Sequence, residues 1–70
     1  MILPDDFKPT PPKFPEFSKR IKAARKAKRL TQSEMADFIG VDFITYFKID
    51  NGHIFPDDDT LKEINRVLFN

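Results

Sequence analysis

Residues 31–52 carry start and stop signals for two short helices separated by a tight turn. The run Thr31-Gln32-Ser33-Glu34 matches a capping box, in which the threonine and glutamate side chains each bond to the other's backbone N–H. Gly40 is expected to end that helix, and Asp42 is placed to cap the next one, which runs to about residue 50. Asn51-Gly52 can adopt the left-handed backbone that closes this second helix. The spacing therefore predicts two short helices joined by a glycine-containing turn.

One further helix is predicted on each side of this pair. The earlier one covers about residues 17 to 28, is rich in alanine, lysine and arginine, and has Ser18 as a candidate cap. Its apolar stripe consists of Phe17, Ile21 and Ala24. The later one opens on Asp57, Asp58 or Asp59, because acidic side chains suit a helix N-terminus. It buries Leu61, Ile64 and either Val67 or Leu68. The sequence predicts an all-α fold of four helices.

Proline divides the chain into two parts. Residues 1–16 hold five of the six prolines, which prevents helical hydrogen bonding, so we expect an extended N-terminal arm there. Residues 17–70 form the expected domain, and a chain of 70 residues is long enough for only one small core. Phe7 and Phe14 interrupt the polar arm, and we expect such rings to dock partly on the domain.

The charges are separated along the chain, although the net charge is only +1. Seven of the twelve basic residues lie between Ser18 and Leu30 with no acid among them, whereas Asp57, Asp58 and Asp59 follow one another near the C-terminus. A basic segment of this kind is typical of phosphate binding, because each phosphate contact releases counterions. An ordinary solvated helix face is the alternative.

Catalysis and metal binding are not expected. His53 is the single histidine, the chain has no cysteine, and His53 is interpreted as a turn residue. The three consecutive aspartates are better explained as helix capping than as a cation site, so no cofactor or metal is predicted. No signal-peptide pattern and no apolar run of membrane-spanning length occurs, and we expect a cytoplasmic location.

The run from Arg25 to Gly52 resembles the lambdoid phage repressor and Cro family of helix-turn-helix proteins. The matching positions are Arg25, Leu30-Thr31-Gln32, Ala36, Gly40-Val41, a core position occupied by Tyr46, Asp50-Asn51-Gly52 and Pro56. Two of these depart from the family's usual residues, since Tyr46 stands where isoleucine is common and Asp50 where glutamate is. With the last helix included, the resemblance covers about residues 17 to 69. It implies a repressor-like domain whose third helix enters the major groove of DNA.

The resemblance also implies which side chains hold phosphates. Gln32 matches an anchor at a helix N-terminus, and Asn51 matches a position that approaches phosphate, although a helix cap explains Asn51 equally well. Arg25 matches an arginine that pairs with the acid at the end of the reading helix, here Asp50, and also faces DNA. The remaining predicted phosphate contacts are Arg20, Lys22 and Phe47.

In the same register, the third helix has an inner and an outer face. Val41, Tyr46 and Ile49 point inward, and the residues expected outside are Phe43, Ile44, Phe47 and Lys48. Phe43 and Ile44 suit contact with thymine methyl groups and Lys48 suits guanine, so these three are the predicted base-reading residues. The carboxylate of Asp42 counts against this assignment unless it caps the helix, because that position lies close to phosphate.

The sequence leaves two functions open. The favoured one is a sequence-specific double-stranded DNA-binding regulator of transcription, of the phage or plasmid repressor or Cro-like type, acting as a homodimer on DNA. The alternative is a protein-binding helix-turn-helix module, such as an antitoxin-like or adaptor domain. Its partner would cover the apolar surface of Phe43, Ile44 and Phe47, whose composition is typical of protein interfaces.

Overall fold

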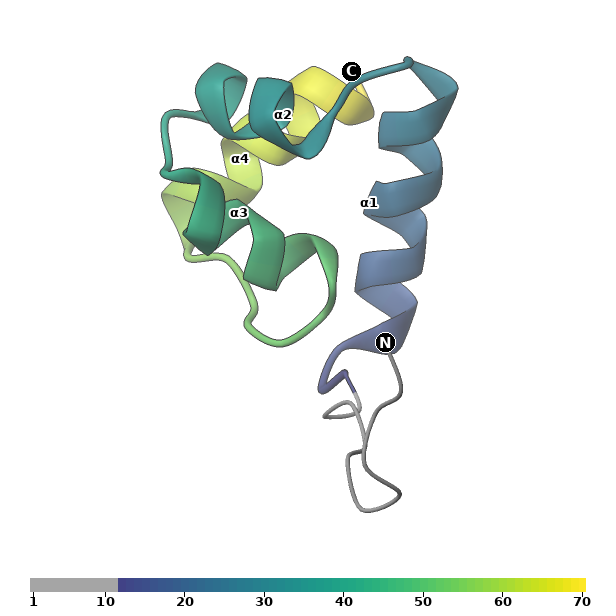
Figure 1. The fold of residues 1–70 in the computed structure, drawn as a ribbon, viewed down its shortest axis with the longest axis vertical. Coiled ribbons are helices and arrows are strands. Elements are labelled where there is room, and N and C mark those ends of the chain that lie inside the picture. Colours follow the sequence, from purple (N-terminus) through teal and green to yellow (C-terminus); the bar gives the residue numbers. More distant parts are fainter. Residues whose placement is uncertain (1–11) are drawn as a thin grey trace, which may run out of the picture.

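The computed structural model describes residues 12–70, and these residues form four α-helices and no strand. The helices are α1 (Pro15–Ala27), α2 (Gln32–Ile39), α3 (Phe43–Asp50) and α4 (Asp58–Leu68). Figure 1 shows α1 along one side of the molecule and the three shorter helices together on the other. The predicted all-α architecture of four helices is confirmed.

All four helices contribute to one core. Ile21 of α1, Met35 of α2, Tyr46 of α3 and Ile64 of α4 are each 0% exposed. Phe17, Ala24, Leu30, Val41 and Val67 pack against this cluster while staying partly exposed. Full burial of a large apolar side chain contributes about 1.5 to 3 kcal/mol relative to its exposed state. The core thus fixes α3 from its inner side and leaves its outer side free.

The first helix begins at Pro15 rather than Phe17, and it ends at Ala27 rather than Lys28. Proline is favoured in the first turn because its missing N–H would have no partner there. Ser18 is therefore not the cap, and the prediction was wrong: this buried residue lies within the helix, where its Oγ donates to the Pro15 carbonyl oxygen over 3.1 Å. The expected division after residue 16 falls inside α1.

Residues 12–14, which we call the N-terminal latch, are fastened to the turn after α3. The backbone N–H groups of Lys13 and Phe14 both donate to the Gly52 carbonyl oxygen, over 2.8 and 2.9 Å. The Phe14 ring also packs on Phe55, with ring centroids 5.3 Å apart. Phe14 thus docks as expected, whereas Phe7 lies outside the described residues. The latch joins the start of the domain to the end of its third helix.

The predicted helix caps are found in most positions. Thr31 and Glu34 form both bonds of the capping box, and Gly40 ends α2 with a left-handed φ of 76°. Asp57 caps α4 by accepting from the Thr60 N–H over 2.8 Å. Asp42 occupies the N-cap position of α3, but its side chain makes no capping hydrogen bond, so that prediction was only half right.

The Asp57 cap predicts a measurable pH dependence of stability. Hydrogen bonding from Thr60 lowers the pKa of the Asp57 carboxyl in the folded state. The stabilisation is therefore present above the unfolded pKa, about 3.9, and is lost as the pH falls through the folded pKa. In urea denaturation between about pH 6 and pH 2, the protein should lose more stability than its Asp57→Asn variant, whose amide caps without titrating. Parallel losses in the two proteins would contradict this assignment.

Candidate nucleic-acid interface

The outer face of α3 is apolar and exposed. Phe43 is 44%, Ile44 57% and Phe47 42% exposed, and the Phe43 and Phe47 rings lie 6.1 Å apart. We call these three residues the α3 patch. Lys48 is exposed on the same helix, whereas Tyr46 and Ile49 are buried. The predicted inner and outer faces of α3 are therefore confirmed.

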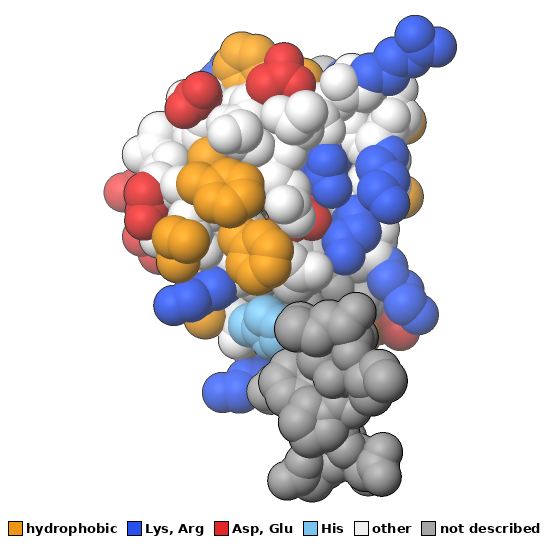
Figure 2. Space-filling view, in the orientation of Figure 1, with side chains coloured by type: hydrophobic (Ala, Val, Ile, Leu, Met, Phe, Trp, Pro, Cys, Tyr) orange, Lys and Arg blue, Asp and Glu red, His pale blue; other side chains and the backbone are white. Residues whose placement is uncertain are grey.

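Basic side chains flank the α3 patch. In Figure 2, hydrophobic side chains gather over α3, and lysine and arginine side chains line up along α1 next to them. A surface of this kind offers apolar contacts in its centre and positive charge at its edge. That combination suits a ligand whose apolar groups lie between two rows of negatively charged groups.

Asp50, at the end of α3, is the buried polar centre of the domain. It is 0% exposed, and its carboxylate accepts from Arg25 Nε over 3.0 Å, from Arg25 Nη2 over 3.3 Å and from Gln32 Nε2 over 2.9 Å. The Tyr46 hydroxyl donates to the same carboxylate over 3.0 Å. We call these four residues the Asp50 hub. The hub ties α1, α2 and α3 together at the C-terminal end of α3.

The hub explains the two departures from the family pattern. Tyr46 brings its hydroxyl to a carboxylate that is one methylene shorter than the usual glutamate. Burial, followed by the neighbouring Asp50 charge, raises the pKa of Tyr46, so its hydroxyl keeps the proton that it donates. Tyr46 is therefore both a core residue and a hydrogen-bond donor to a buried carboxylate.

Arg25 and Gln32 are held differently within the hub. The guanidinium of Arg25 is directed inward, because it also donates to the Leu30 carbonyl oxygen over 2.7 Å and the residue is only 8% exposed. A structural pair with Asp50 accounts for these contacts, and phosphate binding by Arg25 stays a prediction. Gln32 is half-buried and uses one amide proton on Asp50, so its second proton is available to an external acceptor.

Lys22 and Asn51 meet where α1 passes the end of α3. Lys22 Nζ donates to Asn51 Oδ1 over 3.4 Å, and Asn51 Nδ2 donates to the Phe47 carbonyl oxygen over 2.9 Å. Asn51 therefore caps the end of α3, which was the alternative to phosphate binding. The same side chain also orients Lys22. Phosphate contacts by either side chain stay predictions. Phe47 has no side-chain donor, so on DNA its ring can only pack against the sugar-phosphate chain.

Arg20 lies apart from the other predicted phosphate contacts. Its guanidinium is 5.6 Å from the centroid of the Phe69 ring. Residues two positions apart on an α-helix point about 200° away from each other, so Arg20 faces away from the side of α1 that carries Lys22. Arg20 and Lys22 therefore lie on different sides of α1, and phosphate binding by Arg20 stays a prediction.

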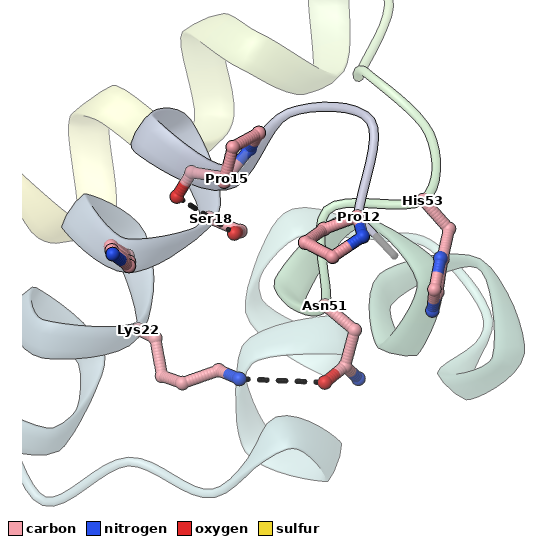
Figure 3. A pocket seen from close by; sticks show the side chains of 7 residues that line it. Pro12, Pro15, Ser18, Lys22, Asn51 and His53 are labelled. Carbon is pink, nitrogen blue, oxygen red and sulfur yellow. Dashed lines mark hydrogen bonds between the residues drawn. The ribbon is translucent and has the colours of Figure 1, made fainter. Parts of the chain in front are cut away.

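Two basic residues near α3 escaped the sequence prediction. Lys19 and His53 line a pocket of about 360 Å³ between α1 and the turn after α3. Its other lining residues are Pro12, Pro15, Ser18, Lys22 and Asn51. Figure 3 shows Lys22 reaching toward Asn51, with Pro12 and His53 on the far side of the pocket. Lys19 and Lys22 are three residues apart and so share a side of α1, and this spacing could have identified Lys19 from the sequence. Only the folded structure places His53 beside them.

The start of α3 carries a negative charge. The Thr45 side chain lowers the pKa of Asp42, so this exposed carboxylate stays ionised at the edge of the α3 patch. A phosphate group would be repelled at this end of the helix. Phosphate contacts are therefore expected near the C-terminal end of α3, where Lys22 and Lys48 lie, rather than near its beginning.

Comparison with known proteins agrees with this architecture. The Helix-turn-helix family matches residues 21–69. Two relatives come from Bacillus subtilis strain 168: an uncharacterized HTH-type transcriptional regulator, YqaE, is 40% identical over 52 residues, and an SPbeta prophage-derived uncharacterized HTH-type transcriptional regulator, YonR, is 36% identical over 52 residues. Each match covers 74% of this chain, but only 45% of YqaE and 48% of YonR.

No solved structure gave a significant match. Among residues 12–70, no helix has both the length and the apolar character that crossing a membrane requires. The fold, the capped helix pair of α2 and α3, and the match over residues 21–69 lead to one conclusion. The chain belongs to the helix-turn-helix family.

Proposed function

We propose that this chain is the DNA-binding domain of a transcriptional regulator, and that its role is binding rather than catalysis. The observation that carries the proposal is the rigid presentation of α3: core residues and the Asp50 hub hold its inner side, and its outer side is exposed between basic side chains. The names of the two Bacillus subtilis relatives, both transcriptional regulators, support the same function.

The chemistry of the outer face suggests how α3 would read bases. Phe43 and Ile44 have no hydrogen-bonding side-chain atoms, so in the major groove they would pack against thymine methyl groups. Lys48 would donate to the O6 and N7 atoms of guanine. We therefore expect a half-site in which thymines lie next to a guanine.

Phosphate contacts would hold the helix in the groove. Gln32 would use its free amide proton together with the N-terminus of α2, and Lys22 and Asn51 would meet the opposite strand at the end of α3. One helix of this size reads few base pairs, so a homodimer on two half-sites one helical turn apart is part of the proposal. The prophage origin in the name of YonR favours a phage-type repressor or Cro-like regulator.

Protein binding is the second candidate, because the α3 patch exposes two phenylalanines and an isoleucine. Exposed apolar patches often mark protein interfaces. Salt separates the two functions: DNA binding should weaken by powers of ten between about 50 and 200 mM salt, whereas an apolar protein interface should respond little. The relatives' names favour the DNA-binding function.

Selection of binding sites from random duplex DNA tests the proposal. The protein should enrich one sequence, and Lys48→Ala should relax the preference at one base position by about 1 to 3 kcal/mol while the rest of the site is kept. Lys62→Ala is the matched control, because Lys62 is an exposed lysine of α4. Failure to enrich any sequence would contradict DNA recognition and favour a protein partner.

A further inference from the structure

We propose that the pocket between the N-terminal latch and the end of α3 binds a phosphate group, held by Lys19, Lys22 and His53. This inference rests on the proposed function, which would supply the phosphate as a backbone diester of DNA. It adds Lys19 and His53 to the interface, and it places a phosphate beyond the base-reading residues of α3.

The part of the pocket that residues 12–70 line carries positive charge. Among these lining residues two are lysines, one is a histidine, and none is an aspartate or glutamate. The ion pairs among residues 12–70 are Arg25 with Asp50 and Arg66 with Glu63, so neither Lys19 nor Lys22 is neutralised by a neighbouring carboxylate there. Cations gathered around one concave site favour the binding of an anion.

The free hydrogen-bond donors of the pocket are side chains. The backbone N–H of His53 already donates to the Lys48 carbonyl oxygen over 2.8 Å. The backbone N–H groups of Lys13 and Phe14 both donate to the Gly52 carbonyl oxygen. The Ser18 hydroxyl donates to Pro15. The Lys19 ammonium, two N–H bonds of the Lys22 ammonium, the second amide N–H of Asn51 and the His53 imidazole remain. They match the several acceptor oxygens of one phosphate.

The position of the pocket connects it with the base-reading surface. Lys22 lines the pocket and also bonds to Asn51, which closes α3. A backbone that runs along the edge of the α3 patch would therefore reach the pocket without a change in the fold. The volume of about 360 Å³ is ample for a phosphate together with part of its flanking sugars.

The N-terminal latch forms one wall of this site. Pro12 lies so close to the turn that a Cβ atom added at Gly52 would be 2.9 Å from Pro12 Cβ. The latch thus holds Pro12 across the pocket from Lys22 (Figure 3), and Lys19 lines the same pocket. Residues 12–14 therefore help to shape the phosphate site.

Binding of the selected duplex by three glutamine variants tests the site. Fluorescence anisotropy should show that Lys19→Gln, Lys22→Gln and His53→Gln each weaken binding by about three- to tenfold on any duplex, and that each lysine variant lowers the salt slope by about one. Lys62→Gln, which removes the same charge from α4, should change neither quantity. If the protein binds duplex but the three variants match Lys62→Gln, the site is refuted while the proposed function stands. If the protein binds no duplex, the proposed function fails first.

Titration with inorganic phosphate distinguishes the two possible ligands of the pocket, free phosphate and a phosphate of the DNA backbone. At equal ionic strength, exchange of chloride for phosphate should shift the amide resonances of residues 19, 22 and 51–53, and His53→Gln should reduce these shifts. Shifts with both phosphate and duplex support the site for either source, and shifts with duplex alone assign it to the DNA backbone. No shift with either would overturn the proposal.

Discussion

Replacing Asp50 with asparagine is expected to destabilise the domain by about 3 to 5 kcal/mol, because it leaves the buried Arg25 guanidinium without its counter-charge. The carboxylate accepts four hydrogen bonds, two from Arg25 and one each from Gln32 and Tyr46. An asparagine amide has only one acceptor atom, and its NH₂ group would face these donors. A core of this size supplies a net stability of about the same amount, so most of the variant should be unfolded at 25 °C.

Urea denaturation monitored by circular dichroism measures this effect, and the molecule contains its own control. Glu63 pairs with Arg66 on the surface of α4, where the side chains are 43% and 58% exposed. Glu63→Gln should change the free energy of unfolding by less than about 1 kcal/mol. If Asp50→Asn and Glu63→Gln have similar small effects, the Asp50 hub does not hold the helices together.

The second large effect is expected at Gly52. Its φ is 78°, a left-handed conformation that costs other residues about 1 to 2 kcal/mol. An added Cβ atom would also lie 2.9 Å from Ser18 Oγ and 2.9 Å from Pro12 Cβ, so the N-terminal latch would have to move. Gly52→Ala should therefore cost about 2 to 4 kcal/mol in urea denaturation, the sum of backbone strain and lost packing.

Gly40 provides the matched control for this substitution. Its φ is 76°, almost the same, but no atom lies within 4 Å of an added Cβ. Gly40→Ala should cost only the backbone strain, about 1 to 2 kcal/mol. The difference between the two alanine variants then measures the crowding of the added Cβ against Ser18 and the latch. Equal losses would contradict the predicted crowding at Gly52.

Much of the fold was predictable because its signals are local. The capping box at Thr31 and Glu34 and the glycine at position 40 each act over a few residues, so the sequence alone located both ends of α2. The register implied by the family resemblance separated the buried Tyr46 and Ile49 from the exposed face of α3. The family resemblance added the Arg25–Asp50 pair, which links residues 25 positions apart in the sequence.

The remaining features depend on contacts that no local signal encodes. Ser18 looks like a cap in the sequence, yet Pro15 starts the helix earlier and the hydroxyl is buried. The convergence of Gln32 and Tyr46 on one carboxylate requires α2 and α3 to be placed first. His53 could be interpreted only as a turn residue, because its neighbours in the pocket come from α1 and from the latch.

The Asp50 hub and the N-terminal latch both act on α3. The hub fixes its inner side, and the latch fixes the turn at its end through Gly52. A reading helix that is held at both places loses little conformational freedom when it enters a groove, which favours binding. The Asp50 hub and the N-terminal latch therefore both fix the orientation of α3.

Amide chemical shifts recorded during titration with the selected duplex test the central claim most directly. We expect the largest shifts at Phe43, Ile44, Phe47 and Lys48 of α3, with a second group at Lys19 and Lys22 of α1, and little change along the exposed side of α4. Saturating duplex that leaves the α3 amides unshifted, or that shifts α4 instead, would contradict the account.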